Sequence, residues 1–253
     1  MATRHPRDEI ETYLNTLLEV DRFEDYGPNG LQVEGRPAVR RMVSGVTASL
    51  ALIDAAIADG ADAILVHHGL FWRGQDGRLV GWLGERVKRL MAAGINLFAF
   101  HLPLDAHPTL GNNAQLGSRL GLAADGRFGE QALGFAGPAH DNTSLAGLTS
   151  RVQAALGGRA PLVVPGDGRA LARIGWCSGG AQGYFEAAIA AGVDAFLTGE
   201  ISEPQAHLAR ETGVSFLACG HHATECFGAP ALAAHVAMHF GLEHRFIEIP
   251  NPA

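Results

Sequence analysis

The sequence has few cysteines, few basic residues and no long apolar run, and each scarcity excludes a class of protein. Only three of its 253 residues are cysteines, without paired spacing, so a secreted fold built on disulfides is not expected. Lys and Arg number 19 against 26 Asp and Glu, and the net charge of −7 argues against a dominant nucleic-acid-binding surface. A local basic patch is compatible with that charge. No apolar run approaches the roughly 18 residues of a membrane span, so we expect a cytoplasmic protein without a membrane partner.

What is present favours a globular α/β protein. Hydrophobic residues make up 47% of the chain, which also contains 33 glycines. Apolar residues at helical spacing predict a first helix over residues 7–20. After residue 40, strands alternate with helices, a cadence typical of parallel sheets. The expected strands are 41–46, 63–66 and 95–100, and the expected helices are 49–59, 81–92 and 111–120.

An internal repeat relates the two halves of the chain. Residues 55–65 match residues 187–197 at eight of eleven positions. Further along, residues 94–99 pair with residues 213–218. Two copies of a strand-helix-strand unit predict two similar α/β lobes with mainly parallel sheets flanked by helices.

Histidines gather where predicted strands end. Six of the twelve lie in three windows, each after an apolar strand: His67 with His68, His101 with His107, and His221 with His222. Ligands of open α/β sheets bind outside the carboxyl ends of the strands, so the three windows can converge on one site. Successive side chains of a strand point to opposite faces, so His67 and His68 reach one point only at a strand end, and otherwise serve two targets. The alternative is structural, with one ring buried and its neighbour solvated.

Carboxylates accompany two of these windows. Asp105 follows His101 by four residues, and Glu225 follows His221 by four; a helix after Gly220 would set His221 and Glu225 on one face. Imidazole and carboxylate ligands suit zinc, manganese, iron or nickel rather than calcium or magnesium. Five such groups exceed the needs of one tetrahedral ion, so we infer two divalent transition-metal ions, bridged by a carboxylate and a water or hydroxide. Such a pair acidifies the bridging water, and hydrolysis is the predicted reaction class.

Three further features have mainly structural interpretations. Cys219 and Cys226 flank the last histidine window and are expected to behave as small hydrophobes rather than ligands. Residues 178–181 contain two glycines between a strand and a helix, where backbone N–H groups could hold a phosphate, although the lysine of a P-loop is missing. Residues 25–33 contain Pro-Asn-Gly and are, by local physics, a turn before a short strand.

Four motifs together resemble a known protein family. They are Asp25-Tyr26-Gly27-Pro28-Asn29-Gly30-Leu31-Gln32-Val33-Glu34-Gly35, Val66-His67-His68-Gly69, His101-Leu102-Pro103-Leu104-Asp105-Ala106-His107 and Gly220-His221-His222-Ala223-Thr224-Glu225. They look like the motifs of the dinuclear-metal-centre hexameric protein family, whose members are often named type 2 homologues of GTP cyclohydrolase I. The chain is similar to the short bacterial form, because no additional domain separates its halves.

The resemblance implies two interlocked α/β lobes, a toroidal homo-hexamer (a trimer of dimers or a dimer of trimers) and a two-metal site. The metal ligands implied by the matching motifs are His67, His68, Asp105, His221 and Glu225. The resemblance also implies that His101 lies close to these ligands. We expect His101 or His222 to be the catalytic residue that moves a proton, and His222 stands where the family varies.

The expected domains are an N-terminal lobe over residues 1–125, which supplies most metal ligands, and a C-terminal lobe over residues 126–253. The second lobe supplies the motif that contains His221 and Glu225, and its C-terminal segment is able to pack back on the first. Only the first copy of the repeat delivers two histidines at its strand exit, so the site should be asymmetric.

Two functions follow from these residues. The leading hypothesis is a metal-dependent hydrolase that uses a bridging hydroxide on a small or nucleotide-like substrate. GTP itself is weakly supported, because no basic triphosphate clamp lies near the motifs. The alternative is a non-catalytic, ring-shaped scaffold or interaction protein with structural or stored metals, able to engage DNA. Structural metal sites are coordinatively closed, whereas catalytic sites keep an open position.

Overall fold

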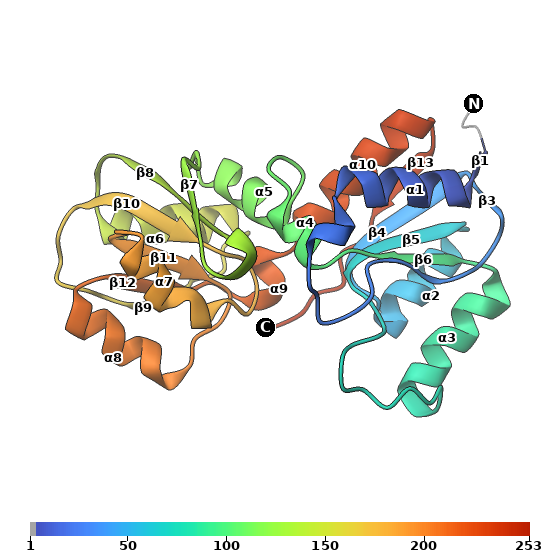
Figure 1. The fold of residues 1–253 in the computed structure, drawn as a ribbon, viewed down its shortest axis with the longest axis horizontal. Coiled ribbons are helices and arrows are strands. Elements are labelled where there is room, and N and C mark those ends of the chain that lie inside the picture. Colours follow the sequence, from blue (N-terminus) through green and yellow to red (C-terminus); the bar gives the residue numbers. More distant parts are fainter. Residues whose placement is uncertain (1–3) are drawn as a thin grey trace. The chain divides into compact units, whose positions relative to one another are not determined.

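The computed structural model describes residues 4–253, which form two compact units (Figure 1). The first unit contains the chain through Gly111 together with Gly228–Pro250. The second contains Asn112–Phe227 and Asn251–Ala253. Each unit has a central sheet with helices, so the α/β class predicted from the sequence is confirmed.

The first unit is built on a five-stranded sheet. Its strands are β2 (Gly30–Val33), β4 (Arg41–Thr47), β5 (Ala63–His68), β6 (Asn96–Ala99) and β13 (Glu243–Phe246), and a separate ladder joins β1 (His5–Pro6) to β3 (Ala38–Val39). Its helices are α1 (Arg7–Leu17), the 3-10 turn η1 (Val20–Arg22), α2 (Leu50–Ala58), α3 (Gly81–Ala93), α4 (Leu102–Ala106) and α10 (Gly228–Phe240). The strand order is β13-β4-β5-β6-β2, parallel except for β2 at the edge.

Both faces of this sheet are covered, which explains the unbroken apolar run of β5. Ala63 and Leu65 belong to the core that α1 and α10 cover, whereas Ile64 and Val66 belong to the core with residues of α2 and α3. The alternation follows from the period of two in a strand. The edge at which β5 ends is thereby held rigidly between two packed layers.

The second unit is built on a six-stranded sheet. Its strands are β7 (Gly126–Phe128), β8 (Gly134–Thr143), β9 (Leu162–Val164), β10 (Leu171–Trp176), β11 (Ala195–Thr198) and β12 (Ser215–Ala218). Its helices are α5 (Asn112–Arg119), α6 (Leu145–Ala155), α7 (Phe185–Ala190), α8 (Glu203–Thr212) and α9 (His221–Thr224), with 3-10 turns η2 (Glu130–Ala132) and η3 (Gln182–Tyr184). The order is β7-β8-β10-β11-β12-β9, in which β10, β11 and β12 are parallel and the other pairings antiparallel.

The division between the units lies after Gly111, not near residue 125. Helix α5 belongs to the second unit because Leu116 and Leu120 are buried in the core around Trp176. The Trp176 indole also donates a hydrogen bond to the Asn113 carbonyl, at 2.9 Å. The glycine-rich stretch after residue 123 forms the antiparallel strands β7 and β8 rather than a linker. Helix α10 returns to the first unit, where Leu232 and Val236 are buried.

The sequence repeat is also a structural repeat. In the first unit Ala63 pairs with Asn96, and at the matching place in the second unit Ala195 pairs with Ser215. The side chains of Asn96 and Ser215 accept the backbone N–H of Gly35 and of a second glycine, Gly166, at 2.8 and 3.1 Å. The two copies therefore share strand register and loop hydrogen bonds.

One aspartate in each copy ties neighbouring backbone together. Asp62 accepts the backbone N–H groups of Arg40 and Arg41 at 2.9 and 3.1 Å. Its repeat partner Asp194 accepts those of Ala172 and Arg173 at 2.8 and 3.0 Å. Burial raises the pKa of Asp62, but the backbone hydrogen bonds and the Arg36 guanidinium outweigh it and lower the pKa below its usual value.

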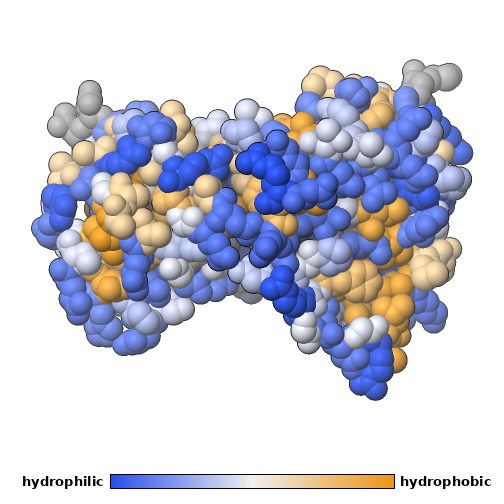
Figure 2. Space-filling view, viewed as in Figure 1, coloured by the Kyte–Doolittle hydropathy of each residue, from blue (hydrophilic) through white to orange (hydrophobic). Residues whose placement is uncertain are grey.

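Between residues 4 and 253, no helix is long and apolar enough to cross a membrane. Large hydrophobic side chains are nevertheless exposed at the start of α3 and along it: Leu79, Val80, Trp82 and Met91. Figure 2 shows apolar surface in the lower right, the part of the view that holds α2 and α3. The Trp82 ring is partly covered by the Arg86 guanidinium, 4.9 Å from its centroid.

Candidate metal-binding sites

His67 and His68 are the last two residues of β5, and their rings converge. The ring centroids are 4.5 Å apart. His67 is fully buried and His68 partly so, beside Thr47 on the neighbouring strand. Of the interpretations left open by the sequence, a strand that ends at the pair is therefore the one observed. Gly69 is needed for space, because a Cβ there would lie 2.3 Å from the side-chain oxygen of Gln32.

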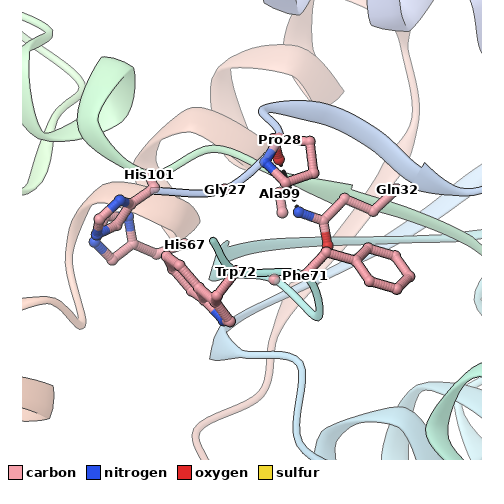
Figure 3. A pocket seen from close by; sticks show the side chains of 9 residues that line it. Gly27, Pro28, Gln32, His67, Phe71, Trp72, Ala99 and His101 are labelled. Carbon is pink, nitrogen blue, oxygen red and sulfur yellow. Dashed lines mark hydrogen bonds between the residues drawn. The ribbon is translucent and has the colours of Figure 1, made fainter. Parts of the chain in front are cut away.

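His101 joins this pair from the adjacent strand. It stands two residues after β6, which runs parallel to β5, so both strands end at the same edge of the sheet. Its ring centroid lies 5.0 Å from that of His67 and 5.7 Å from that of His68. One nitrogen from each ring lies within 4.8 Å of the others, which makes the three histidines a group able to hold a metal ion. Figure 3 shows the adjoining rings of His67 and His101.

Asp105 contributes a carboxylate to the same cluster. It lies on α4, the short helix that begins directly after His101, and its side chain is nearly buried. Its Oδ2 lies 3.5 Å from Nε2 of His67. Helix α4 therefore places the Asp105 carboxylate beside the His67 ring. His107 has another role, because its Nδ1 accepts the Leu110 backbone N–H at 3.0 Å and closes the following turn.

The ring nitrogens of this cluster are oriented by hydrogen bonds. Nδ1 of His67 lies 3.0 Å from the Phe100 carbonyl oxygen, and Nδ1 of His101 lies 2.7 Å from a carboxylate oxygen of Asp25. Both partners only accept, so each Nδ1 carries the proton, and in the neutral ring each Nε2 keeps its lone pair. Nδ1 of His68 lies 3.3 Å from the Thr47 hydroxyl, a group that donates or accepts.

A small open pocket adjoins the cluster within the first unit. Its cavity volume is about 10 Å³, and its lining consists of Gly27, Pro28, Gln32, His67, Gly69, Phe71, Trp72, Ala99 and His101. In Figure 3 the two histidine rings lie at one end and Phe71 and Gln32 at the other. The amide of Gln32 is engaged with the Pro28 carbonyl and the Leu70 N–H at 2.8 and 2.7 Å. Pockets that enclose drug-sized ligands are usually larger, about 300–1,000 Å³. This pocket by itself therefore suits a small group.

Trp72 should report metal binding at the histidine cluster. Its ring centroid lies 5.1 Å from that of His101 and 5.9 Å from that of His68. We expect Cu²⁺ to quench the Trp72 share of the fluorescence of chelator-treated protein, because an open-shell ion quenches an indole at short range. The measurement compares emission from wild type and Trp72→Phe during titration with Cu²⁺ and with closed-shell Zn²⁺. Equal fractional quenching of the two proteins by Cu²⁺ would contradict binding beside Trp72.

The second unit brings His221 and Glu225 together. Helix α9 begins at His221 and ends just before Glu225, so the two side chains lie one turn apart on the same face, as the spacing predicts. Nε2 of His221 is 3.2 Å from Oε2 of Glu225, whose side chain is only 3% exposed. An imidazole and a carboxylate are thus held side by side at the exit of β12.

Glu200, which the sequence did not single out, lies behind His221. Its Oε1 is 2.6 Å from Nδ1 of His221. The hydrogen bond to Glu225, followed by the one to Glu200, raises the pKa of His221 to about 9 against the opposing effect of burial. Because Ala195 corresponds to Ala63, Glu200 occupies the repeat position of His68. That correspondence is the sequence signal that could have identified Glu200.

Gly179 makes room for this pair. A Cβ on Gly179 would lie 2.1 Å from Oε1 of Glu225 and 3.2 Å from Nε2 of His221, and its φ is +68°. The Gly179 N–H donates to the Thr224 hydroxyl at 2.9 Å, and the Ala181 N–H donates to the Thr198 hydroxyl at 3.2 Å. These two amides are therefore engaged within the protein. Gly179 therefore provides space for the Glu225 side chain, and its own amide is not available to an anion.

His222 and the neighbouring cysteines lie apart from this pair. His222 is buried on α9, and among the described residues no candidate metal-binding group joins it to His221 or Glu225. Cys226 donates through its Sγ to the His222 carbonyl at 3.1 Å. Cys219 is a buried core residue, and burial raises the pKa of its thiol to about 12. The prediction that Cys219 behaves as a hydrophobe is confirmed.

The donor set fits a divalent transition metal. Imidazole nitrogens that keep a lone pair on Nε2, backed by acceptors on Nδ1 and accompanied by carboxylates, are the usual surroundings of zinc and related ions. Fold and site therefore define an α/β protein with histidine and carboxylate groups at its strand ends that can bind metal ions.

Comparison with known proteins gives the family. The chain belongs to the Duf34/NIF3 (NGG1p interacting factor 3) family, whose model matches residues 6–252. It is 52% identical over 249 residues to a Pseudomonas aeruginosa protein named GTP cyclohydrolase 1 type 2 homolog, with 97% of this chain and 96% of that protein covered. A protein of the same name from Escherichia coli K12 is 46% identical over 252 residues, with 97% and 98% covered. The resemblance drawn from the four motifs is confirmed.

Solved structures agree with this assignment. A structure described as "protein ybgI, unknown function" is 46% identical, covers 98% of this chain and 100% of its own, and superposes with a TM-score of 0.94. The protein TTHA1606 from Thermus thermophilus is 36% identical, with the same coverage and a TM-score of 0.87. The α/β fold described above is thus shared with related proteins.

Proposed function

We propose that this protein binds divalent transition-metal ions at its strand ends and uses them to hydrolyse a small or nucleotide-like substrate. His67, His68 and Asp105 are the proposed ligands of the first unit, and His221 and Glu225 those of the second. Zinc, manganese, iron and nickel are the candidate ions. That the five ligands serve two ions stays a prediction from the donor count, as does the homo-hexamer implied by the resemblance.

The observation that carries the proposal is the shared orientation of the histidines. Three rings have an acceptor within 3.0 Å of Nδ1: a carbonyl behind His67 and carboxylates behind His101 and His221. Behind His67 and His101, a protonated Nδ1 leaves Nε2 able to coordinate a cation, and an ion that displaces the Nε2 proton of His221 gives that ring the same form. Histidines that serve only packing have no need of three such supports beside carboxylates.

The chain's own residues support hydrolysis as the reaction class. Divalent ions of this kind, when bound, lower the pKa of water and polarise carbonyl or phosphoryl oxygens. His101 is the proposed catalytic residue, because its ring is partly exposed, lines the pocket and has a carboxylate at its back to stabilise a gained proton. Trp72 and Phe71 add apolar surface to the lining of this pocket.

Metal content is the first test of the proposed function. We expect purified protein, stripped with chelator and dialysed against Zn²⁺, Mn²⁺, Fe²⁺ or Ni²⁺, to retain stoichiometric metal by elemental analysis. His67→Ala and His221→Ala should each lose bound metal. The matched control is His207→Ala, because His207 is an exposed histidine 2.7 Å from a glutamate on the same helix. A wild type without retained metal, or variants that keep it, would refute metal binding.

Activity is tested on the reconstituted protein with a panel of phosphate esters, nucleotides and amides. GTP belongs in the panel because a relative is named GTP cyclohydrolase 1 type 2 homolog. We expect turnover to require metal and to fall in Glu225→Gln, which keeps the size of the side chain but removes its charge. Retained metal with no turnover of any of these classes would contradict hydrolysis and favour the scaffold alternative.

A further inference from the structure

Asp25 is placed to hold the ring of His101. The Asp25 carboxylate, only 3% exposed, accepts the His101 Nδ1 hydrogen bond at 2.7 Å. It also accepts the backbone N–H of Leu102 at 2.9 Å and of Tyr26 at 2.6 Å, and the Asn29 side-chain amide at 2.8 Å. Four donors thus surround one buried carboxylate, and this network fixes its position and its charge.

The side chain of Asn29 hydrogen-bonds to both His101 and Asp25. Its Oδ1 accepts the backbone N–H of His101 at 2.7 Å, while its Nδ2 donates to Asp25. The turn that contains Asp25 and Asn29 therefore holds both the main chain and the ring of a histidine more than 70 residues away in sequence. A turn that served only to start β2 would not require these contacts.

The Asp25 carboxylate is ionised at neutral pH. Burial raises its pKa, but the hydrogen bond from the His101 ring, with the Asn29 and Leu102 donors, outweighs burial and lowers the pKa to about 2. An ionised carboxylate cannot donate, so the hydrogen bond to His101 requires the proton on Nδ1. In the neutral ring, Nε2 is then the nitrogen of His101 that has a lone pair for the cluster.

We propose that Asp25 is a positioning residue, which fixes His101 as the Nδ1–H tautomer with its Nε2 lone pair available beside His67 and His68. The inference deepens the proposed function and rests on it for its purpose, although the tautomer exists without metal. A histidine in water favours the opposite tautomer, with the proton on Nε2, which would place an N–H where a cation or a substrate proton must be accepted. Removing Asp25 should therefore leave the His101 ring in place but with the proton on Nε2, which then cannot accept a cation or a proton.

The test reads the tautomer directly in the metal-free protein. Long-range ¹H–¹⁵N correlation spectra of ¹⁵N-histidine-labelled protein at pH 8.5 distinguish protonated from unprotonated ring nitrogens, and His101→Asn identifies the His101 signals. We expect a protonated Nδ1 in wild type and a shift toward protonated Nε2 in Asp25→Ala. Asp21→Ala is the matched control, an exposed carboxylate four residues earlier that should change nothing. An unprotonated Nδ1 in wild type overturns the inference, even if Asp25→Ala does not fold.

A Zn²⁺ competition titration against a fluorescent chelator separates this inference from the proposed function. His101 is not among the proposed ligands, so we expect Asp25→Ala to bind Zn²⁺ as tightly as Asp21→Ala while the tautomer of His101 changes. A protonated Nδ1 that persists in Asp25→Ala overturns the positioning role and leaves metal binding intact. A wild type with a protonated Nδ1 that binds no Zn²⁺ supports the tautomer assignment and refutes the proposed function.

Discussion

Gly179→Ala is expected to abolish metal binding by His221 and Glu225 and to destabilise the second unit. The added Cβ would lie 2.1 Å from Oε1 of Glu225, a buried carboxylate that cannot move aside without breaking its pairing with His221. The alanine would also have to adopt a φ of +68°, which costs about 1–2 kcal/mol for a residue with a Cβ. The variant should bind Zn²⁺ at least as weakly as His221→Ala and unfold at a lower temperature.

Two other glycines separate the steric effect from the backbone effect. Gly192 has a φ of +75° and nothing within 4 Å of the place that a Cβ would take, so Gly192→Ala carries the backbone strain alone. Gly183 has neither a positive φ nor a close neighbour, so Gly183→Ala should be neutral. Calorimetric melting and Zn²⁺ titration of the three variants give the comparison. If Gly179→Ala binds Zn²⁺ like Gly192→Ala, the close approach to Glu225 is unimportant.

Asp62→Ala is expected to lower the free energy of unfolding by about 3 kcal/mol, since hydrogen bonds to charged groups contribute about 1.5–3 kcal/mol each and partners left buried add a penalty. Asp62 binds two backbone N–H groups and the Arg36 guanidinium, at 2.7 Å, so its loss leaves three donors without an acceptor. Urea unfolding at pH 7 measures the change. Asp76→Ala removes an exposed carboxylate paired with Arg78 and should leave the free energy of unfolding nearly unchanged.

The same carboxylate predicts a pH dependence. The pKa of Asp62 is lower in the folded protein than the ordinary aspartate value of 3.8, so its stabilisation is present above pH 3.8 and is lost as the pH falls through the lower folded value. The stability gap between wild type and Asp62→Asn should therefore narrow as the pH falls below 3.8. A gap that stays constant across this range would show that Asp62 acts through shape and not through charge.

The strands and helices of the first unit were largely predictable because they follow apolar periodicity. The predicted strand over 63–66 is observed as β5 over Ala63–His68, and the predicted helix over 81–92 as α3 over Gly81–Ala93. Strand ends were predictable for the same reason, and with them the meeting of His67, His68 and His101. Periodicity is a local property, so it reports local structure well.

The residues that hold the candidate ligands in position could not be predicted from local sequence patterns. Asp25 meets His101 across 76 positions of sequence, and its own surroundings indicate only a turn. Gly179 acts on Glu225 through a tertiary contact that no local spacing contains, and Glu200 is indicated only by its repeat correspondence with His68. The placement of α5 and α10 likewise depends on which core buries their apolar faces, and both cores are apolar enough to accept a helix.

A single substitution at Gly199 cannot give the second copy of the repeat the histidine pair that the first copy has. Gly199 occupies the repeat position of His67, but a Cβ on it would lie 2.6 Å from the Gly179 carbonyl oxygen and 2.6 Å from Cα of His221. No histidine fits there without movement of two backbone segments. The second copy therefore supplies His221 at a place where the histidine pair of the first copy does not fit. Restoring symmetry would require rebuilding the backbone, so the two halves are now specialised parts.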